Sequence, residues 1–234
     1  MPNPNTRRAR GLDVLVLVVA GLVNTVLAPA DAALVLAPGT PAQGGNLTVR
    51  MAWVTAHADQ WQAGWAFWFV VTTTFAWSYY ALARHLGGPL PWRTLAVWLA
   101  LAAAAVDLAG VLLNLGLLPQ LAQRAQEVPV EAQQPAALTY LAAETLANQL
   151  TTAAYGLYTG AGLLLLPALV ATPAYPRPLV WLGAAEWAVA TVTTALLVLA
   201  PALATGPLLL SFLLYAPWVW GSAWWIAHPG RPAR

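Results

Sequence analysis

The sequence predicts an all-α, polytopic integral membrane protein that folds as a helical bundle. Of its 234 residues, 60% are hydrophobic and only 8% are charged, whereas soluble domains carry about 25% charged residues. Apolar stretches of about 20 residues, the length that crosses about 30 Å of hydrocarbon as a helix, occur six times. A soluble fold is therefore excluded, and residues 1–234 are predicted to form a single transmembrane domain.

The six predicted transmembrane helices differ in how they are connected. They cover residues 12–36, 61–83, 94–118, 146–170, 179–200 and 207–227. Short connections rich in Pro and Gly join the second to the third and the fourth to the fifth, as in helical hairpins. The connections 37–60 and 119–145 are predicted to be long outer loops, and long ordered loops are often functional. The first apolar stretch exceeds a signal-peptide core, so we expect the first helix to be retained.

The basic residues predict the orientation. All ten are Arg, and eight of them lie on the cytoplasmic side if the N-terminus does, which leaves only Arg50 and Arg124 outside. Basic residues concentrate on the cytoplasmic side of membrane proteins. We therefore expect a multi-pass protein of the cell membrane with both termini cytoplasmic (N-in/C-in). The Ala-, Leu- and Pro-rich composition, with Arg in place of Lys, is typical of a high-GC bacterial genome.

Several function classes are excluded by composition. The chain has no Cys, so it can form neither a disulfide nor a thiolate metal site. It has no Lys, so it cannot form a Schiff base. The Arg residues flank apolar spans, which indicates orientation rather than nucleic-acid binding. Because the chain also lacks paired His residues and an HExxH motif, we expect no metal site and no cofactor.

Aromatic residues gather at the ends of the predicted spans. Trp61, Trp65 and Trp68 open the second span, and Trp77, Tyr79 and Tyr80 close it. Trp218 is one of several Trp near cytoplasmic helix ends. Such positions are typical of the aromatic belts that lie at the two membrane surfaces.

Polar residues inside the spans are the candidates for a binding site, because an ionisable side chain in hydrocarbon costs at least ~2.5 kcal/mol. Asp107 lies about 21 Å along its helix from Arg93, near the bilayer centre. Gly110 and Asn114 follow at i+3 and i+7 and share its face. That face must meet another helix or a water-filled cavity.

The fourth predicted span carries a polar stripe at the helical period. It consists of Glu144, Asn148, Thr151, Tyr155, Thr159 and Gly162. Thr and Gly also favour close packing of membrane helices, so packing alone can account for part of the stripe. Packing alone does not account for Glu144, Asn148 and Tyr155, whose role is either structural hydrogen bonding or binding of a ligand or proton.

Glu186, next to Trp187, lies about 9 to 13 Å from the cytoplasmic end of its span. Since no basic residue lies in any span, its carboxyl group must be protonated, hydrogen-bonded, hydrated or neutralised by a cation. His57 lies at the outer approach to the second span. The full candidate set for ligand binding is Asp107, Asn114, Glu144, Asn148, Tyr155, Glu186, Trp187 and His57.

These residues predict an outward-facing intramembrane polar pocket that binds or carries a small lipophilic or cationic ligand. The expected partners are membrane lipids and that ligand. Two alternatives stay open. The chain could be a structural or accessory subunit whose polar stripe is buried against a membrane-protein partner. It could also be an intramembrane isomerase or hydratase that uses Asp107 or Glu144 as general acid or base.

Overall fold

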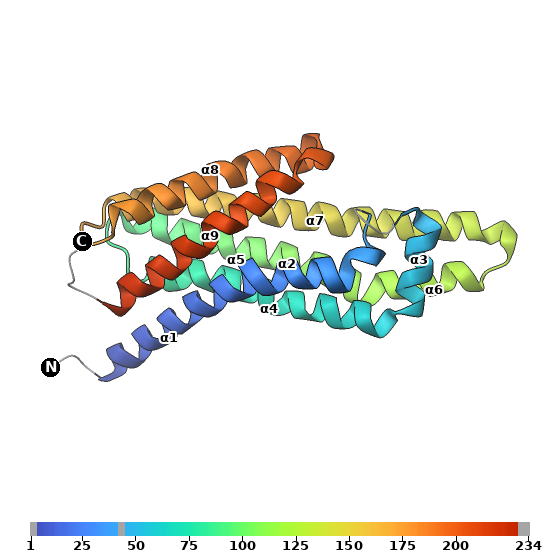
Figure 1. Cartoon of the computed structure of the whole chain (residues 1–234), viewed down its shortest axis with the longest axis horizontal. Coiled ribbons are helices and arrows are strands. Elements are labelled where there is room, and N and C mark those ends of the chain that lie inside the picture. The colour runs from blue at the N-terminus through green and yellow to red at the C-terminus, as the bar shows by residue number, and fades with distance from the viewer. Residues whose placement is uncertain (1–3, 42–44, 229–234) are drawn as a thin grey trace.

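The computed structural model describes residues 4–41 and 45–228, and in these ranges the chain is helical without a strand (Figure 1). Five helical runs of the described residues are long and apolar enough to cross a membrane: Arg8–Gly39, Leu90–Glu127, Val130–Val170, Arg177–Leu199 and Thr205–Ala227. The helix at the second predicted span is long enough, at 26 residues, but its many Trp, Tyr and Thr side chains make it less apolar. The all-helical prediction is confirmed in the described ranges, together with five membrane-length apolar helices.

Each predicted span corresponds to a helix. The first run consists of α1 (Pro4–Leu22), η1 (Val23–Leu27), α2 (Ala28–Asp31), η2 (Ala32–Leu36) and η3 (Ala37–Gly39). It is followed by α3 (Leu47–Ala56) and α4 (Ala58–Ala83). The next run consists of α5 (Leu90–Leu112), η4 (Leu113–Leu117) and α6 (Leu118–Glu127). The chain then forms α7 (Val130–Val170), α8 (Arg177–Leu199), η5 (Pro201–Leu203) and α9 (Thr205–Ala227).

The two predicted long loops are wrong, because both segments are mostly helical. Residues 37–60 contain α3, and residues 119–145 contain most of α6 and the first part of α7. Pro119 lies in the first turn of α6 and Pro129 directly precedes α7. Proline fits at helix starts, where its missing N–H has no partner to lose. Pro129 therefore marks the beginning of α7, whereas Pro119 lies inside the continuous helical run Leu90–Glu127, just after the π-turn η4.

The helical hairpin of α6 and α7 extends well past the end of α8 and α9, and α3 lies beside it (Figure 1). We call α3, α6 and residues 130–145 of α7 the outer cap. Its small core joins Met51 and Val54 of α3, Ala122 of α6 and Tyr140 of α7 to Trp61 at the start of α4.

Three π-turns, η1, η2 and η4, interrupt the long runs in the described residues, and two of them, η1 and η4, lie at equivalent positions before a proline. Asn24 in η1 and Asn114 in η4 each lie five residues before a proline, Pro29 and Pro119 respectively. Proline provides no N–H and its ring displaces a carbonyl of the preceding turn, which widens the helix there. Each Asn side chain donates to the carbonyl four residues earlier, at 2.9 Å. The carbonyl of Asn114 accepts from the indole N–H of Trp61 at 2.7 Å.

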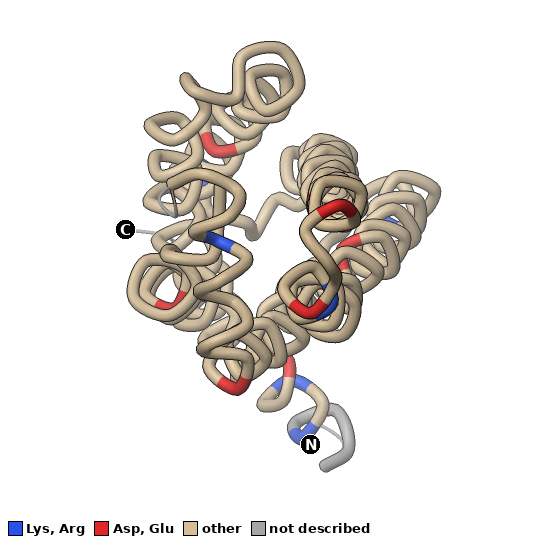
Figure 2. The backbone as a smooth tube through the Cα atoms, turned by 90° about the vertical axis from the view of Figure 1, so that its right-hand side faces the viewer, with Lys and Arg blue, Asp and Glu red and all other residues tan. Residues whose placement is uncertain are grey.

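The long helices form a ring. Each packs mainly against two neighbours, in the order α1, α4, α5, α7, α8, α9 and back to α1; Figure 2 views these helices end-on and shows how few charges they carry. The first turns of α1 and the end of α9 lie at the same end of the molecule, opposite the outer cap (Figure 1).

Several aromatic side chains are buried between helices, Trp61 in the core of the outer cap and Tyr79 and Trp218 in the interior of the ring of helices. Trp61, Tyr79 and Trp218 are buried, which corrects their placement in surface belts, whereas Trp77 is exposed. Glycines make room for the interior indoles. A Cβ atom on Gly162 would lie 2.0 Å from Nε1 of Trp187, so a larger residue at this position would force the indole to shift.

Candidate functional site

A cavity of about 10 Å³ lies between α4, α7, α8 and α9. Rings of Phe75, Tyr158 and Tyr215 form much of its wall, and Phe75 contacts the other two with ring centroids 4.7 and 4.8 Å apart. A cavity of this volume holds about one water molecule. The polar groups of Glu186 and Ser211 also line it.

Only one of the two carboxyl oxygens of Glu186 has a hydrogen-bond partner among the described residues. Its Oε1 atom accepts a hydrogen bond from Ser211 Oγ at 2.9 Å, and Ser211 Oγ accepts from the Tyr155 hydroxyl at 2.9 Å. The other carboxyl oxygen, Oε2, is buried and has no hydrogen-bond partner among the described residues. Only 4% of the Glu186 surface is exposed. Such an atom needs an explanation in a native fold, of which a bound water, ion or proton is one; the indole N–H groups of Trp187 and Trp218 are also buried without a partner among the described residues.

The charge of Glu186 is also uncompensated. In residues 4–41 and 45–228 the ion pairs are Arg50 with Glu144, and Arg84 and His85 with Asp13. None of them reaches α8. A carboxylate removed from water without a positive neighbour is costly, so a proton or a cation must neutralise it.

Asp107 of α5 is also buried between the helices, but it does not line the cavity. Its Oδ2 atom accepts a hydrogen bond of 2.6 Å from Thr72 Oγ1. The backbone carbonyl of Thr72 accepts from the Tyr158 hydroxyl at 3.4 Å. Because the Tyr158 side chain also lines the cavity, one tyrosine connects the surroundings of Asp107 with those of Glu186.

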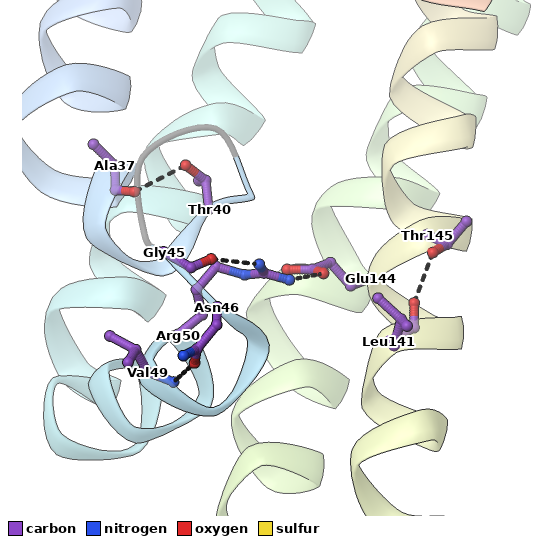
Figure 3. A network of polar contacts seen from close by, with 9 residues as sticks. All are labelled: Ala37, Thr40, Gly45, Asn46, Val49, Arg50, Leu141, Glu144 and Thr145. Carbon is purple, nitrogen blue, oxygen red and sulfur yellow. Dashed lines mark hydrogen bonds and ion pairs between the residues drawn. The ribbon is translucent and has the colours of Figure 1, made fainter. Parts of the chain in front are cut away.

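Glu144 lies in the outer cap and has a positive partner. Its Oε2 atom contacts Nη2 of Arg50 at 2.6 Å, and Nη1 of Arg50 donates to the carbonyl of Gly45 at 3.1 Å. Figure 3 shows this arginine reaching from α3 to α7. Both side chains are buried. This pair fixes α3 against α7, and it satisfies the charge that made Glu144 a binding candidate.

The remaining candidates do not gather at the cavity. Asn114 lies in the η4 turn against Trp61. Asn148 is exposed on α7. His57 is exposed at the end of α3, where its ring stacks on Trp53 with centroids 4.8 Å apart. The structure therefore brings together Tyr155, Glu186 and Trp187 from the predicted set, with Asp107 nearby, and separates the others from them.

Sequence reasoning missed three partners of the buried acids and one buried acid. Thr72, Ser211 and Arg50 were not among the candidates, and Asp13 of α1 was not recognised as a buried acid although it is 1% exposed. Asp13 could have been found by the rule that selected Asp107, since both lie within predicted spans.

The described part of the chain contains no group of three or more His, Asp or Glu side chains that could hold a metal ion. The chain matches no protein-family model, no curated protein and no solved structure. Its function has to follow from the chemistry of its own residues.

Proposed function

We propose that this protein spans the cell membrane with six helices, both termini cytoplasmic, and holds a small monovalent cation, the proton included, at Glu186. It would act as a carrier or sensor for that cation. The observation that carries the proposal is the Oε2 atom of Glu186, which is buried beside a cavity and has neither a hydrogen-bond partner nor a countercharge among the described residues.

The size of the cavity favours a cation no larger than water. Pockets for drug-sized ligands measure about 300 Å³ or more, whereas this cavity measures about 10 Å³. The sequence predicted a ligand that is either lipophilic or cationic, and the small cavity favours the cation. Aromatic ring faces attract cations, and Phe75 and Tyr215 contribute such rings beside Glu186.

The arrangement of the helices supports six spans. The helix α4 occupies a place in the ring between α1 and α5, and its 26 residues measure about 39 Å along the axis. Because α4 packs between two membrane-length helices, α4 is expected to span the membrane as well. The eight Arg residues on one side in this topology favour cytoplasmic termini.

Infrared difference spectroscopy tests the proposal. The purified protein in lipid nanodiscs is taken from pH 5 to pH 9 in choline chloride, and then at fixed pH from choline to sodium, potassium or ammonium chloride. We expect a carboxyl C=O band to change in at least one of these steps in the wild type. The same band is expected to be absent from Glu186→Gln.

The matched control is Asp59→Asn, which removes an exposed carboxyl group at the start of α4. This variant is expected to keep the band. If wild type and Glu186→Gln give identical carboxyl spectra in every step, Glu186 exchanges neither a proton nor a cation and the proposal is wrong.

A further inference from the structure

We propose that Asp31 binds the primary ammonium group of a membrane lipid in the outer leaflet, such as phosphatidylethanolamine. Asp31 ends α2 in the first helical run, and Trp68 of α4 holds its carboxylate in place. The inference rests on the topology in the proposed function, which places this end of the bundle at the outer surface of the membrane. It does not depend on Glu186.

The carboxylate of Asp31 is fixed in position but not neutralised. Its Oδ2 atom accepts a hydrogen bond of 3.0 Å from the indole N–H of Trp68. The ion pairs among the described residues do not include Asp31, and its side chain is partly exposed. The indole is an uncharged donor. A cationic donor can therefore still bind the carboxylate from the exposed side, with the stronger hydrogen bonds that opposite charges give.

The surface around Asp31 is apolar. Leu27 and Leu34 lie one turn before and one turn after Asp31, so they share its side of the helical run. They are 41% and 78% exposed. In a membrane, leucine side chains exposed to this degree contact acyl chains. A ligand that fits this surface has an apolar part beside the leucines and a cationic part at the carboxylate, and a lipid with an ammonium headgroup has both.

The depth of Asp31 matches that of the outer headgroups. At the inner end of the bundle, Asp13 of the first run pairs with Arg84, which follows α4. Farther out, Asp31 and Trp68 connect the same two elements. Asp31 lies about 27 Å along its run from Asp13, and Trp68 lies about 24 Å along α4 from Arg84. Because the hydrocarbon layer is about 30 Å thick, Asp31 lies near its outer boundary, where Trp side chains are also common.

The chemistry of the site favours a primary ammonium group over other headgroups. Such a group carries a positive charge and three N–H donors, like the side chain of lysine. The quaternary ammonium group of phosphatidylcholine has the charge but no N–H donor. The headgroup of phosphatidylglycerol carries only the negative charge of its phosphate, which the carboxylate repels. Phosphatidylethanolamine is therefore expected to bind most tightly of the three.

Native mass spectrometry of the delipidated protein in detergent measures this order. The protein is titrated with phosphatidylethanolamine, phosphatidylcholine or phosphatidylglycerol of identical acyl chains. We expect wild type to bind the first phosphatidylethanolamine about tenfold more tightly than either other lipid, which is the effect of one hydrogen bond between charged groups. Asp31→Asn is expected to abolish the preference and Trp68→Phe to reduce it. The matched control Asp59→Asn, which removes an exposed carboxyl group, is expected to keep it.

Glycerophosphoethanolamine, the same headgroup without acyl chains, separates a lipid site from a site for free amines. We expect it to leave the binding of phosphatidylethanolamine unchanged at equal concentration. If it displaces the lipid, the occupant is a free amine and the lipid assignment is wrong. Equal affinities for the three lipids, or a wild-type preference in Asp31→Asn, would also overturn the inference.

The infrared band of Glu186 distinguishes this inference from the proposed function. Asp31→Asn is expected to retain that band and a single size-exclusion peak. If this variant does not fold, Trp68→Phe carries the test, because it keeps the carboxyl group and an aromatic ring and removes only the indole N–H donor. A lipid preference without the band means that the ammonium site stands and the cation site is wrong. The band without a lipid preference means the reverse.

Discussion

Two buried glutamates on neighbouring helices have opposite surroundings. Glu144 in the outer cap is 5% exposed and contacts Arg50 at 2.6 Å. Glu186 in the ring is 4% exposed, yet its only hydrogen bond comes from Ser211 and one of its oxygens has no partner in the described residues. The partners, rather than the small exposed area, separate an ion-paired acid from one that has no countercharge among the described residues.

The difference shows that burial alone does not identify a binding site. A buried ion pair holds two elements together, and removal of one partner leaves a charge stranded in the interior. A buried acid without a countercharge contributes little to such a connection and needs a proton or a cation instead. The outer cap and the ring of helices are therefore expected to respond differently to mutation.

The largest effect is expected at the cap. Arg50→Leu leaves Glu144 buried and unpaired, which costs about 3 to 5 kcal/mol of the free energy of unfolding. Unfolding by sodium dodecyl sulfate in mixed micelles, followed by tryptophan fluorescence, measures the loss. The double variant Arg50→Leu, Glu144→Leu is expected to recover most of it. If Arg50→Leu alone is as stable as wild type, the ion pair of Arg50 and Glu144 does not stabilise the outer cap.

A smaller effect is expected in the packing behind Glu186. Gly162→Ala places a Cβ atom 2.0 Å from Nε1 of Trp187, so the indole must shift, at a cost of about 1 to 3 kcal/mol. The same unfolding measurement detects it, and the Glu186 infrared band should also shift. Gly11→Ala is the control, because a Cβ atom there meets nothing within 4 Å among the described atoms. Equal stability of the two variants would contradict the packing of Trp187 against Gly162.

The smallest effect is expected from the hydroxyl that supports Ser211. Tyr155→Phe removes the hydrogen bond to Ser211 Oγ and is expected to cost about 0.5 to 1.5 kcal/mol. The Glu186 carboxyl band should shift in frequency but persist, because Ser211 still donates to Oε1. Loss of the band would mean that Tyr155, rather than Ser211, controls the carboxyl group.

The helical fold follows from the sequence because hydrophobic length is a strong signal, and a helix lies at each of the six predicted spans. The outer cap could not be predicted from the same signal. Pro119 and Pro129 lie in the predicted loop 119–145, but the helix that contains α6 continues through Pro119, and α7 begins directly after Pro129, because proline is also accepted at helix starts. The π-turns at Asn24 and Asn114 have a visible pattern, an Asn five residues before a Pro, that was not used.

The candidate site was predicted in part. Glu186, Trp187 and Tyr155 meet at the cavity as neighbours, and burial of an acid without a nearby Arg in the sequence was the signal that found Glu186. Glu144 was selected because it lies on the polar stripe of the fourth predicted span, but its partner, Arg50 of α3, lies 94 residues earlier in the chain. Contacts between segments so distant in sequence depend on how the helices pack, which hydropathy and spacing do not specify.

Parallel unfolding of Glu144→Gln and Glu186→Gln tests the central distinction most directly. The same chemical change is made at two sites that each expose little surface, 5% at Glu144 and 4% at Glu186. Glu144→Gln strands the charge of Arg50 and is expected to lower the free energy of unfolding by about 3 kcal/mol, whereas Glu186→Gln removes an uncompensated charge and is expected to leave stability unchanged or higher while abolishing the carboxyl band. Equal losses of stability at the two positions would contradict the account.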